Sequence, residues 1–203
     1  MADLDGFGDV SVEASPQASE HDKSLALTAQ SEFEKSNYAA AIQSLARLES
    51  SRPHDPKVAH NKAVVSCFKS GLTNVTGLRR SLAQIAKQMQ CDLDSPQTLV
   101  DVDQCYTFYN EAVSLYYLRQ YPKSLQILTR IFAFIEQLDE SLARQVCFLL
   151  AEIFLRLDCP HKTLSVVHFM ETRSVLQFNF QFTQYYWNGG FHRRSLSLSR
   201  LAC

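Results

Sequence analysis

Glycine is nearly absent from the central part of this 203-residue chain. Between residues 24 and 170 it occurs only twice, at Gly71 and Gly77, while alanine, leucine, glutamine, isoleucine and lysine are frequent. Because glycine weakens helices and these other residues favour them, the span is predicted to be helical. Hydrophobic residues make up 46% of the chain and charged residues 20%, values that exclude a wholly disordered chain.

Long apolar runs are also missing. No stretch approaches the roughly 18 consecutive apolar residues of a membrane-spanning helix. The first residues, Met1-Ala2-Asp3-Leu4-Asp5, are acidic where a signal peptide is basic and then apolar. We therefore expect a protein of the cytoplasm and nucleus with no membrane contact.

The six cysteines form no C-x-x-C pair, and in a reducing compartment they are expected to be free thiols that pack as small apolar residues. They are Cys67, Cys91, Cys105, Cys147, Cys159 and Cys203.

The net charge of −1 hides an uneven distribution. Residues 1–22 carry six acids and no Lys or Arg, and residues 172–203 carry four bases and no acid. The part between them is close to neutral, which argues against sequence-independent binding of nucleic acid. Residues 1–22 also contain few large apolar groups, so we interpret them as a disordered acidic tail.

The helical span is organised in antiparallel pairs. Apolar residues recur at three- and four-residue spacing from Cys105 to Tyr116 and again from Leu125 to Leu138, so each helix is predicted to bury one side. Pro122 and Pro160 each fit the first turn of the second helix of a pair, where the missing N–H costs nothing.

Small residues repeat at fixed positions of these pairs. The offsets between four such alanines are 34, 49 and 39 residues, and 34 residues is the tetratricopeptide period. The alanines are Ala29, Ala63, Ala112 and Ala151. Twelve residues after three of them comes a second set of small residues, Ala41, Ser124 and Thr163. In the second repeat we expect the segment from Gly71 to Gly77 to replace the compact turn.

The pattern predicts an all-α fold, a tetratricopeptide-repeat solenoid of antiparallel helix pairs with about four repeats. We place the repeat region at residues 23–175, between the tail of residues 1–22 and a divergent tail of residues 176–203. In this last tail, residues 176–183 alternate polar and apolar side chains, a strand pattern. Two interpretations are open: a capping hairpin, or an end that comes from alternative splicing or a shifted reading frame, which we favour.

Catalytic motifs are not found. The chain has no G-x-S-x-G, no phosphate-binding glycine loop and no H-E-x-x-H. Cys159, His161 and His168 are the closest approach to a metal cluster, but no fourth ligand follows at a matching spacing. We therefore expect no enzyme, no cofactor and no metal site.

A solenoid of helix pairs offers a concave surface lined by the first helix of each pair. Aromatic and asparagine side chains at inward positions are suited to holding a peptide. The candidate partner groove consists of His60, Asn61, Val64, Phe68, Tyr109, Asn110, Val113 and Tyr117. Burial of Phe68 and Tyr117 against a neighbouring repeat is an equally weighted alternative.

Several segments carry a closer resemblance: Tyr106–Val113, Tyr121–Leu125, Phe148–Phe154 and the acidic start Met1-Ala2-Asp3. Through them, residues 1 to about 175 resemble the N-terminal part of the tenth-subunit family of the CCR-NOT deadenylase complex. Members of this family are much longer solenoids, so the resemblance implies a truncated or alternatively spliced form.

The resemblance implies a non-catalytic scaffold subunit. Its expected partners are proteins, namely the eleventh subunit and the large scaffold subunit of the complex, without direct contact to nucleic acid. The implied processes are mRNA deadenylation and decay, translational repression and miRNA-mediated silencing.

The alternative function is a chaperone adaptor that binds acidic C-terminal peptides, suggested by Asn61 and Asn110 at groove positions. Such a clamp needs several bases nearby, and only Lys62 and Lys69 are close in sequence.

Overall fold

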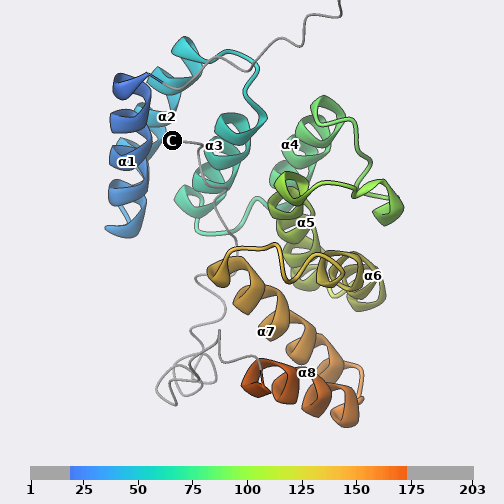
Figure 1. Cartoon of the computed structure of the whole chain (residues 1–203). Helices are drawn as coiled ribbons and strands as arrows, with labels where there is room; N and C mark the ends of the chain where they lie inside the picture. The colour runs from blue at the N-terminus through green and yellow to red at the C-terminus, as the bar shows by residue number, and fades with distance from the viewer. Residues whose placement is uncertain (1–18, 173–203) are drawn as a thin grey trace, which may run out of the picture.

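The computed structural model describes residues 19–172, and these fold into eight α-helices with two short 3₁₀ helices and no strand. Figure 1 shows their arrangement. The α-helices are α1 (Glu20–Glu34), α2 (Tyr38–Ser51), α3 (Pro56–Lys69), α4 (Val75–Gln88), α5 (Cys105–Tyr117), α6 (Tyr121–Phe132), α7 (Glu140–Arg156) and α8 (Pro160–Thr172). The 3₁₀ helices η1 (Pro96–Thr98) and η2 (Val102–Gln104) lie between α4 and α5.

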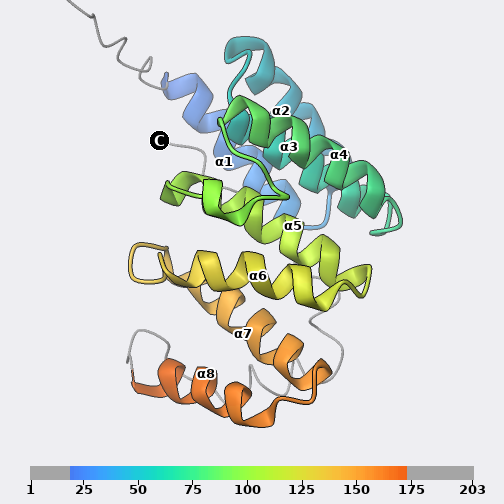
Figure 2. The same ribbon diagram turned by 90° about the vertical axis from the view of Figure 1, so that its right-hand side faces the viewer.

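The eight helices form four antiparallel pairs that stack in chain order. Each helix packs on the next one along the chain, and α5 also touches α7 across a pair boundary. Figures 1 and 2 show the pairs following one another from α1–α2 to α7–α8. The predicted all-α array of about four helix pairs is confirmed.

The same turn closes the first helix of every pair. Each turn contains a residue with φ between 55° and 68°, the left-handed conformation that ends a helix in a Schellman motif. These residues are Ser36, Gly71, Arg119 and Asp158. In the third pair, the Arg119 N–H donates to the Tyr116 carbonyl at 2.9 Å and the Gln120 N–H donates to Leu115 at 2.8 Å. The repeat is therefore a repeat of backbone geometry as well as of sequence.

The small residues of the second helices lie where the two helices of a pair touch. The Ser124 hydroxyl donates to the Ala112 carbonyl at 2.7 Å, and the Thr163 hydroxyl donates to the Ala151 carbonyl at 3.3 Å. Ala41, at the same position of the first pair, is fully buried. A larger side chain at this position would separate the helices, which explains the spacing of small residues in the sequence.

Three helix boundaries differ from the predicted ones. Gly77 lies inside α4 and not in the turn, because Asn74 caps the helix by accepting a hydrogen bond from the Gly77 N–H at 3.0 Å. A Cβ at Gly77 would lie 2.4 Å from Nδ2 of Asn74, so with a larger residue there the Asn74 side chain would have to shift. Helix α1 begins at Glu20, three residues before the boundary predicted at residue 23, since Ser19 and Asp22 form a capping box.

The third boundary difference is at the end of α6. The apolar pattern continues to Leu138, but the helix ends at Phe132 and a turn follows. Ile135 and Leu138 are nevertheless half-buried against the main core. Apolar spacing alone does not separate a helix from a well-packed turn that follows it.

Thiol burial agrees with the expectation for five cysteines. Cys67, Cys91, Cys105 and Cys147 are buried free thiols and Cys159 is a partly exposed one. Cys203 and the two predicted tails, apart from residues 19–22, lie outside the described residues. Among residues 19–172 no helix combines the length and the apolar character that crossing a membrane requires.

Arg119 tests the cost of the left-handed turn. Replacing Arg119 with Gly removes a Cβ from a residue with φ 58°, and the side chain is exposed and forms no ion pair within residues 19–172. We expect the free energy of unfolding to rise by about 1 kcal/mol, because the left-handed conformation strains any residue with a Cβ. Urea denaturation measures the change.

The matched control is Arg80→Gly in the middle of α4, which should lower stability by about 1 kcal/mol. If both substitutions destabilise equally, the turn at Arg119 is not strained.

Candidate functional site

The residues predicted to line a partner groove are mostly buried. Seven of the eight have at most 8% of their surface exposed, and Tyr117 is half-buried. The buried residues are His60, Asn61, Val64, Phe68, Tyr109, Asn110 and Val113. Their contact with a partner stays a prediction, but in the free chain they do not form an open groove. The physical reason is that the inward positions of α3 and α5 are used for contacts inside the array.

A buried polar network joins two of these first helices. Asn110 of α5 donates through Nδ2 to Nε2 of His60 in α3, at 2.9 Å. On the other side of the ring, His60 Nδ1 lies 3.2 Å from Oδ1 of Asn61. An acceptor at Nε2 and a donor at Nδ1 are the requirements of one neutral tautomer of the imidazole, which carries its proton on Nδ1. The network therefore holds His60 uncharged between the second and third pairs.

Burial lowers the pKa of His60 from 6.5 to about 4. The opposing effects, a hydrogen bond with Asn61 and one with the backbone of Tyr106, are smaller than the loss of solvation. The ring is 1% exposed, so charging it inside the protein is costly. His60 is therefore a structural histidine at neutral pH.

Phe68 follows the alternative interpretation of its role, burial against a neighbouring repeat. The Phe68 ring packs edge-on against Phe33 of α1 with the ring centroids 5.0 Å apart, and 5.8 Å from Tyr38 of α2. Tyr117 is half-buried, and its ring lies edge-on to that of Tyr116 in the same helix, with the ring centroids 5.9 Å apart. Phe68 thus links the second pair to the first, as a core residue does.

A buried ion pair connects α4 and α5, and the sequence analysis missed it. Nε and Nη2 of Arg79 both bond Oε1 of Glu111, at 2.7 and 2.6 Å. Glu111 is 3% exposed, and its Oε2 has no hydrogen-bond partner among the described residues. Burial raises the pKa of Glu111, while Arg79 opposes that rise. An acid within the otherwise uncharged run Cys105–Tyr117 was a signal for a buried pair, but the sequence does not identify its partner.

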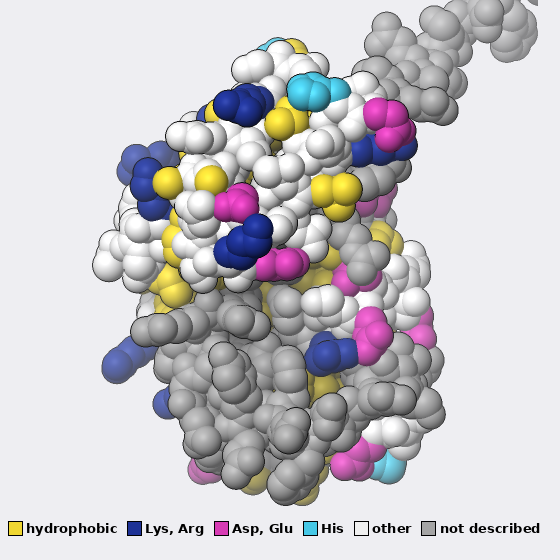
Figure 3. Space-filling view, turned by 90° about the vertical axis from the view of Figure 1, so that its left-hand side faces the viewer, with side chains coloured by type: hydrophobic (Ala, Val, Ile, Leu, Met, Phe, Trp, Pro, Cys, Tyr) yellow, Lys and Arg dark blue, Asp and Glu magenta, His cyan; other side chains and the backbone are white. Residues whose placement is uncertain are grey.

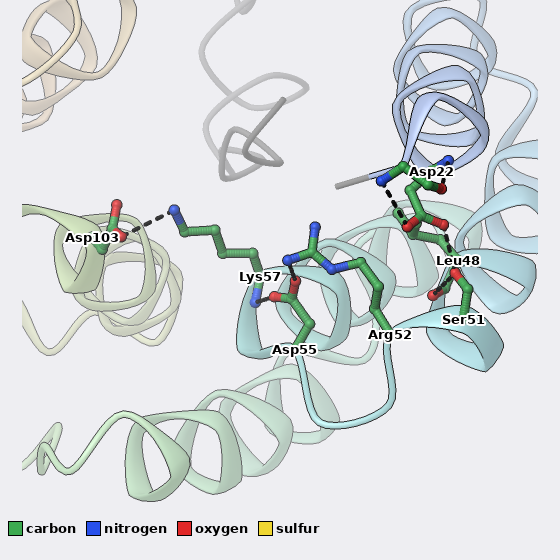
Figure 4. Close-up of polar contacts among 8 residues, drawn as sticks. Asp22, Leu48, Ser51, Arg52, Asp55, Lys57 and Asp103 are labelled. Carbon is green, nitrogen blue, oxygen red and sulfur yellow. Dashed lines mark hydrogen bonds and ion pairs between the residues drawn. The ribbon is translucent and has the colours of Figure 1, made fainter. Parts of the chain in front are cut away.

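A row of polar contacts runs along the edge where α1, α2, α3 and η2 meet, as Figure 4 shows. Ser51 at the end of α2 donates to Asp22 of α1 at 2.7 Å, and this hydrogen bond lowers the pKa of Asp22. The contacts continue as two ion pairs of 3.0 Å, Arg52 with Asp55 and Lys57 with Asp103. Ion pairs near the surface contribute little stability individually, and these contacts join the ends of neighbouring helices.

No metal site is formed within residues 19–172, where no three His, Cys, Asp or Glu residues are grouped to hold an ion. Cys159 and His161 lie in and after the turn before α8, and His168 is exposed further along that helix. The features that remain are helix packing, one neutral polar network and one buried ion pair. They define an all-α array of stacked helix pairs of the tetratricopeptide-like class.

The chain matches no protein-family profile. It is 35% identical to CCR4-NOT transcription complex subunit 10-A of Xenopus laevis over 159 residues, which are 78% of this chain and 21% of that protein. Subunit 10-B of the same species is 34% identical over 161 residues, with 79% and 21% covered. Subunit 10 of Drosophila melanogaster is 28% identical over 137 residues, with 65% and 22% covered.

The chain is therefore related to CCR4-NOT subunit 10 over most of its length, and the resemblance seen in the sequence is confirmed. It spans about a fifth of the length of these relatives.

The His60 network predicts a dependence of stability on pH. The unfolded chain binds a proton at His60 below about pH 6.5, but the folded chain does so only near pH 4. The stability that the buried neutral His60 contributes is therefore fully present above about pH 6.5, and it is lost as the pH falls toward 4. From pH 7 to pH 5 we expect a loss of about 2 kcal/mol that His60→Gln does not show.

Urea denaturation of both proteins at the two pH values measures this difference. His168→Gln serves as the control, because His168 is exposed and should leave the dependence unchanged. Parallel pH curves for the parent and His60→Gln would contradict the buried neutral assignment.

The Arg79–Glu111 pair predicts unequal effects of single and double substitutions. Arg79→Met leaves the Glu111 carboxylate buried without its cation, and we expect a loss of about 2 kcal/mol, reduced because the Arg79 side chain is 31% exposed. Adding Glu111→Gln should recover most of this loss, since the remaining group is neutral.

The control is Arg80→Met at the next position. Arg80 is exposed and forms no ion pair within the described part of the chain, so its replacement should change stability by less than about 0.5 kcal/mol. Chemical denaturation that gives equal losses for Arg79→Met and Arg80→Met would show that the pair does not stabilise the fold.

Proposed function

We propose that the chain is a non-catalytic interaction subunit of a CCR4-NOT deadenylase complex. The observation that carries the proposal is the 34–35% identity to subunit 10 of that complex over 78–79% of the chain. The stacked helix pairs support it, since arrays of this kind bind partners through extended surfaces. Among the described residues, no three His, Cys, Asp or Glu side chains are grouped to hold a metal ion.

The partners that we propose are the eleventh subunit and the large scaffold subunit of the complex. Through them the chain would support mRNA deadenylation and decay, translational repression and miRNA-mediated silencing, in the cytoplasm and the nucleus. Contact with RNA would then be indirect, which agrees with the near-neutral charge of the chain.

The chaperone-adaptor alternative receives less support. It depends on the free amides of Asn61 and Asn110 in an open groove. Both residues are at most 3% exposed, and both amides lie against the His60 ring at 2.9–3.2 Å. A peptide would have to displace the buried network before it reached either amide.

Recovery of the eleventh subunit on the tagged chain tests the proposed function. We expect recovery comparable to that on full-length subunit 10, with Gln126→Arg equal to the parent because Gln126 is exposed. Ser124→Arg should lower recovery severalfold, because Ser124 is fully buried between α5 and α6 and the larger side chain separates that pair. If the full-length protein recovers the eleventh subunit and this chain does not, the chain lacks the proposed activity.

A further inference from the structure

The second helix pair has a charge composition unlike that of the other three helix pairs. Residues 56–91 contain six Lys and Arg residues and no Asp or Glu. The six are Lys57, Lys62, Lys69, Arg79, Arg80 and Lys87. Any acid that neutralises them must therefore come from another part of the protein.

Three of the six bases are neutralised in this way, each by an acid from a neighbouring element. Lys57 pairs with Asp103 at 3.0 Å, Lys62 with Glu49 at 2.5 Å and Arg79 with Glu111 at 2.6 Å. The other three, Lys69, Arg80 and Lys87, are exposed and form no ion pair among the residues described here. The pairing leaves a surplus of positive charge on the surface.

Two of these unpaired bases lie together on α4. The helix buries Leu78, Leu82 and Ile85, and its opposite side exposes Arg80, Gln84 and Lys87. Arg80 and Lys87 are seven residues apart, which is about 10 Å along a helix. The exposed side of α4 therefore presents two positive charges separated by an uncharged polar residue.

Lys123 of α6 extends this surface. It is exposed, and its charge lowers the pKa of Glu111, the α5 carboxylate that Arg79 of α4 bonds. Figure 2 shows α4 and α6 on the side that faces the viewer. We call Arg80, Gln84, Lys87 and Lys123 the outer basic face.

The side of the molecule that carries α1 is different. In Figure 3, Lys and Arg side chains lie among Asp and Glu side chains over the described part of that side. Helix α1 itself contains the ion pairs Lys23–Glu20 and, with the residue after it, Lys35–Glu32. Charges that alternate in this way largely cancel at the surface, whereas those of the outer basic face do not.

We propose that the outer basic face docks a short acidic segment of a partner protein. Carboxylates about 10 Å apart, as at positions i and i+7 of a helix, match the spacing of Arg80 and Lys87. Gln84 between them can hydrogen-bond such a segment without adding charge. The proposal adds a surface and a partner chemistry to the interaction subunit proposed above and rests on that function.

A protein segment fits this face better than a nucleic acid. The face is bounded by acids: Asp94 is close enough to Arg79 to raise its pKa, and Asp92 is exposed just after α4. A strand of phosphates longer than this face would meet these carboxylates. Three bases also fall short of the six to ten phosphate contacts typical of tight nucleic-acid binding.

Nuclear magnetic resonance titration of the ¹⁵N-labelled chain tests the proposal directly. The probe is a 15-residue alanine-based helical peptide with glutamates at i, i+4 and i+7, and the same peptide with glutamines is the neutral comparison. We expect the glutamate peptide alone to shift the amide signals of residues 80–88. Raising the salt concentration should weaken the effect, because exposed charges are screened.

Charge reversal then locates the binding. Arg80→Glu with Lys87→Glu should weaken the glutamate peptide about tenfold, since two attractive contacts become repulsive. The control pair, Lys69→Glu with Arg119→Glu, makes the same change in net charge at two exposed residues, the last residue of α3 and a residue in the turn after α5. It should weaken the peptide less than about twofold.

Three outcomes overturn the proposal. The first is that both pairs of substitutions weaken binding of the glutamate peptide equally. The second is that an oligoadenylate binds more tightly than the glutamate peptide, and the third is that a peptide of residues 1–18 does so, which would make a segment of this chain the occupant. The titration uses no other subunit of the complex. Its failure therefore leaves recovery of the eleventh subunit intact, and failure of that recovery leaves the titration intact.

Discussion

A pair of antiparallel helices has more apolar surface than the two helices can cover between themselves, and the rest of this fold follows from that constraint. Each pair completes its burial against the next pair, so the largest apolar cluster is continuous from α3 to α8. Helix α5 shows the result most clearly: eleven of its residues are buried, among them Tyr109, Asn110 and Val113. Positions that a helical wheel assigns to a concave groove are then used for packing between repeats. Surfaces available to a partner are therefore found on the exposed sides of the second helices and on the edges of the array.

Apolar packing only weakly determines the register of one helix pair along the next, because contacts between alkyl groups tolerate small shifts. The two buried polar contacts around α5 are not tolerant. The His60–Asn110 hydrogen bond fixes α5 against α3, and the Arg79–Glu111 pair fixes it against α4. Each requires donors and acceptors to meet within about 3 Å, and an error of one helical turn would leave a buried polar group without a partner. Both contacts are placed at the boundary between the second and third pairs, where the long connector from Met89 to Gln104 constrains the chain least. We infer that they set the register at this boundary.

The fold was predictable because its determinants are local. Helix stripes, Pro122 and Pro160, and the spacing of Ala112 and Ser124 are all visible within one repeat, and the structure places Ser124 on the Ala112 carbonyl. The helix boundaries were less predictable, since the Asn74 cap that draws Gly77 into α4 depends on side-chain geometry. The candidate groove was not predictable at all from position in the helix. Whether His60 faces solvent or Asn110 depends on how a residue fifty positions away packs. Sequence periodicity holds no information about contacts between residues so far apart in the sequence.

The difference between buried polar groups that bond one another and exposed cations without a partner affects how the chain can recognise partners. At the boundary between the second and third pairs, the buried polar groups are amides, an uncharged imidazole and the Arg79–Glu111 ion pair, and they bond one another. They offer an approaching charge nothing to pair with unless the helix pairs separate. The unpaired cations of α4 and α6 lie on the outside, where losing them removes no core contact. Selection acting on partner choice can therefore change Arg80, Lys87 or Lys123 without disturbing the fold, whereas the same change at His60 or Glu111 would act first on stability. In a solenoid built this way, different residues determine folding and partner recognition. Binding properties can therefore vary on the outer sides of the second helices without a change in stability.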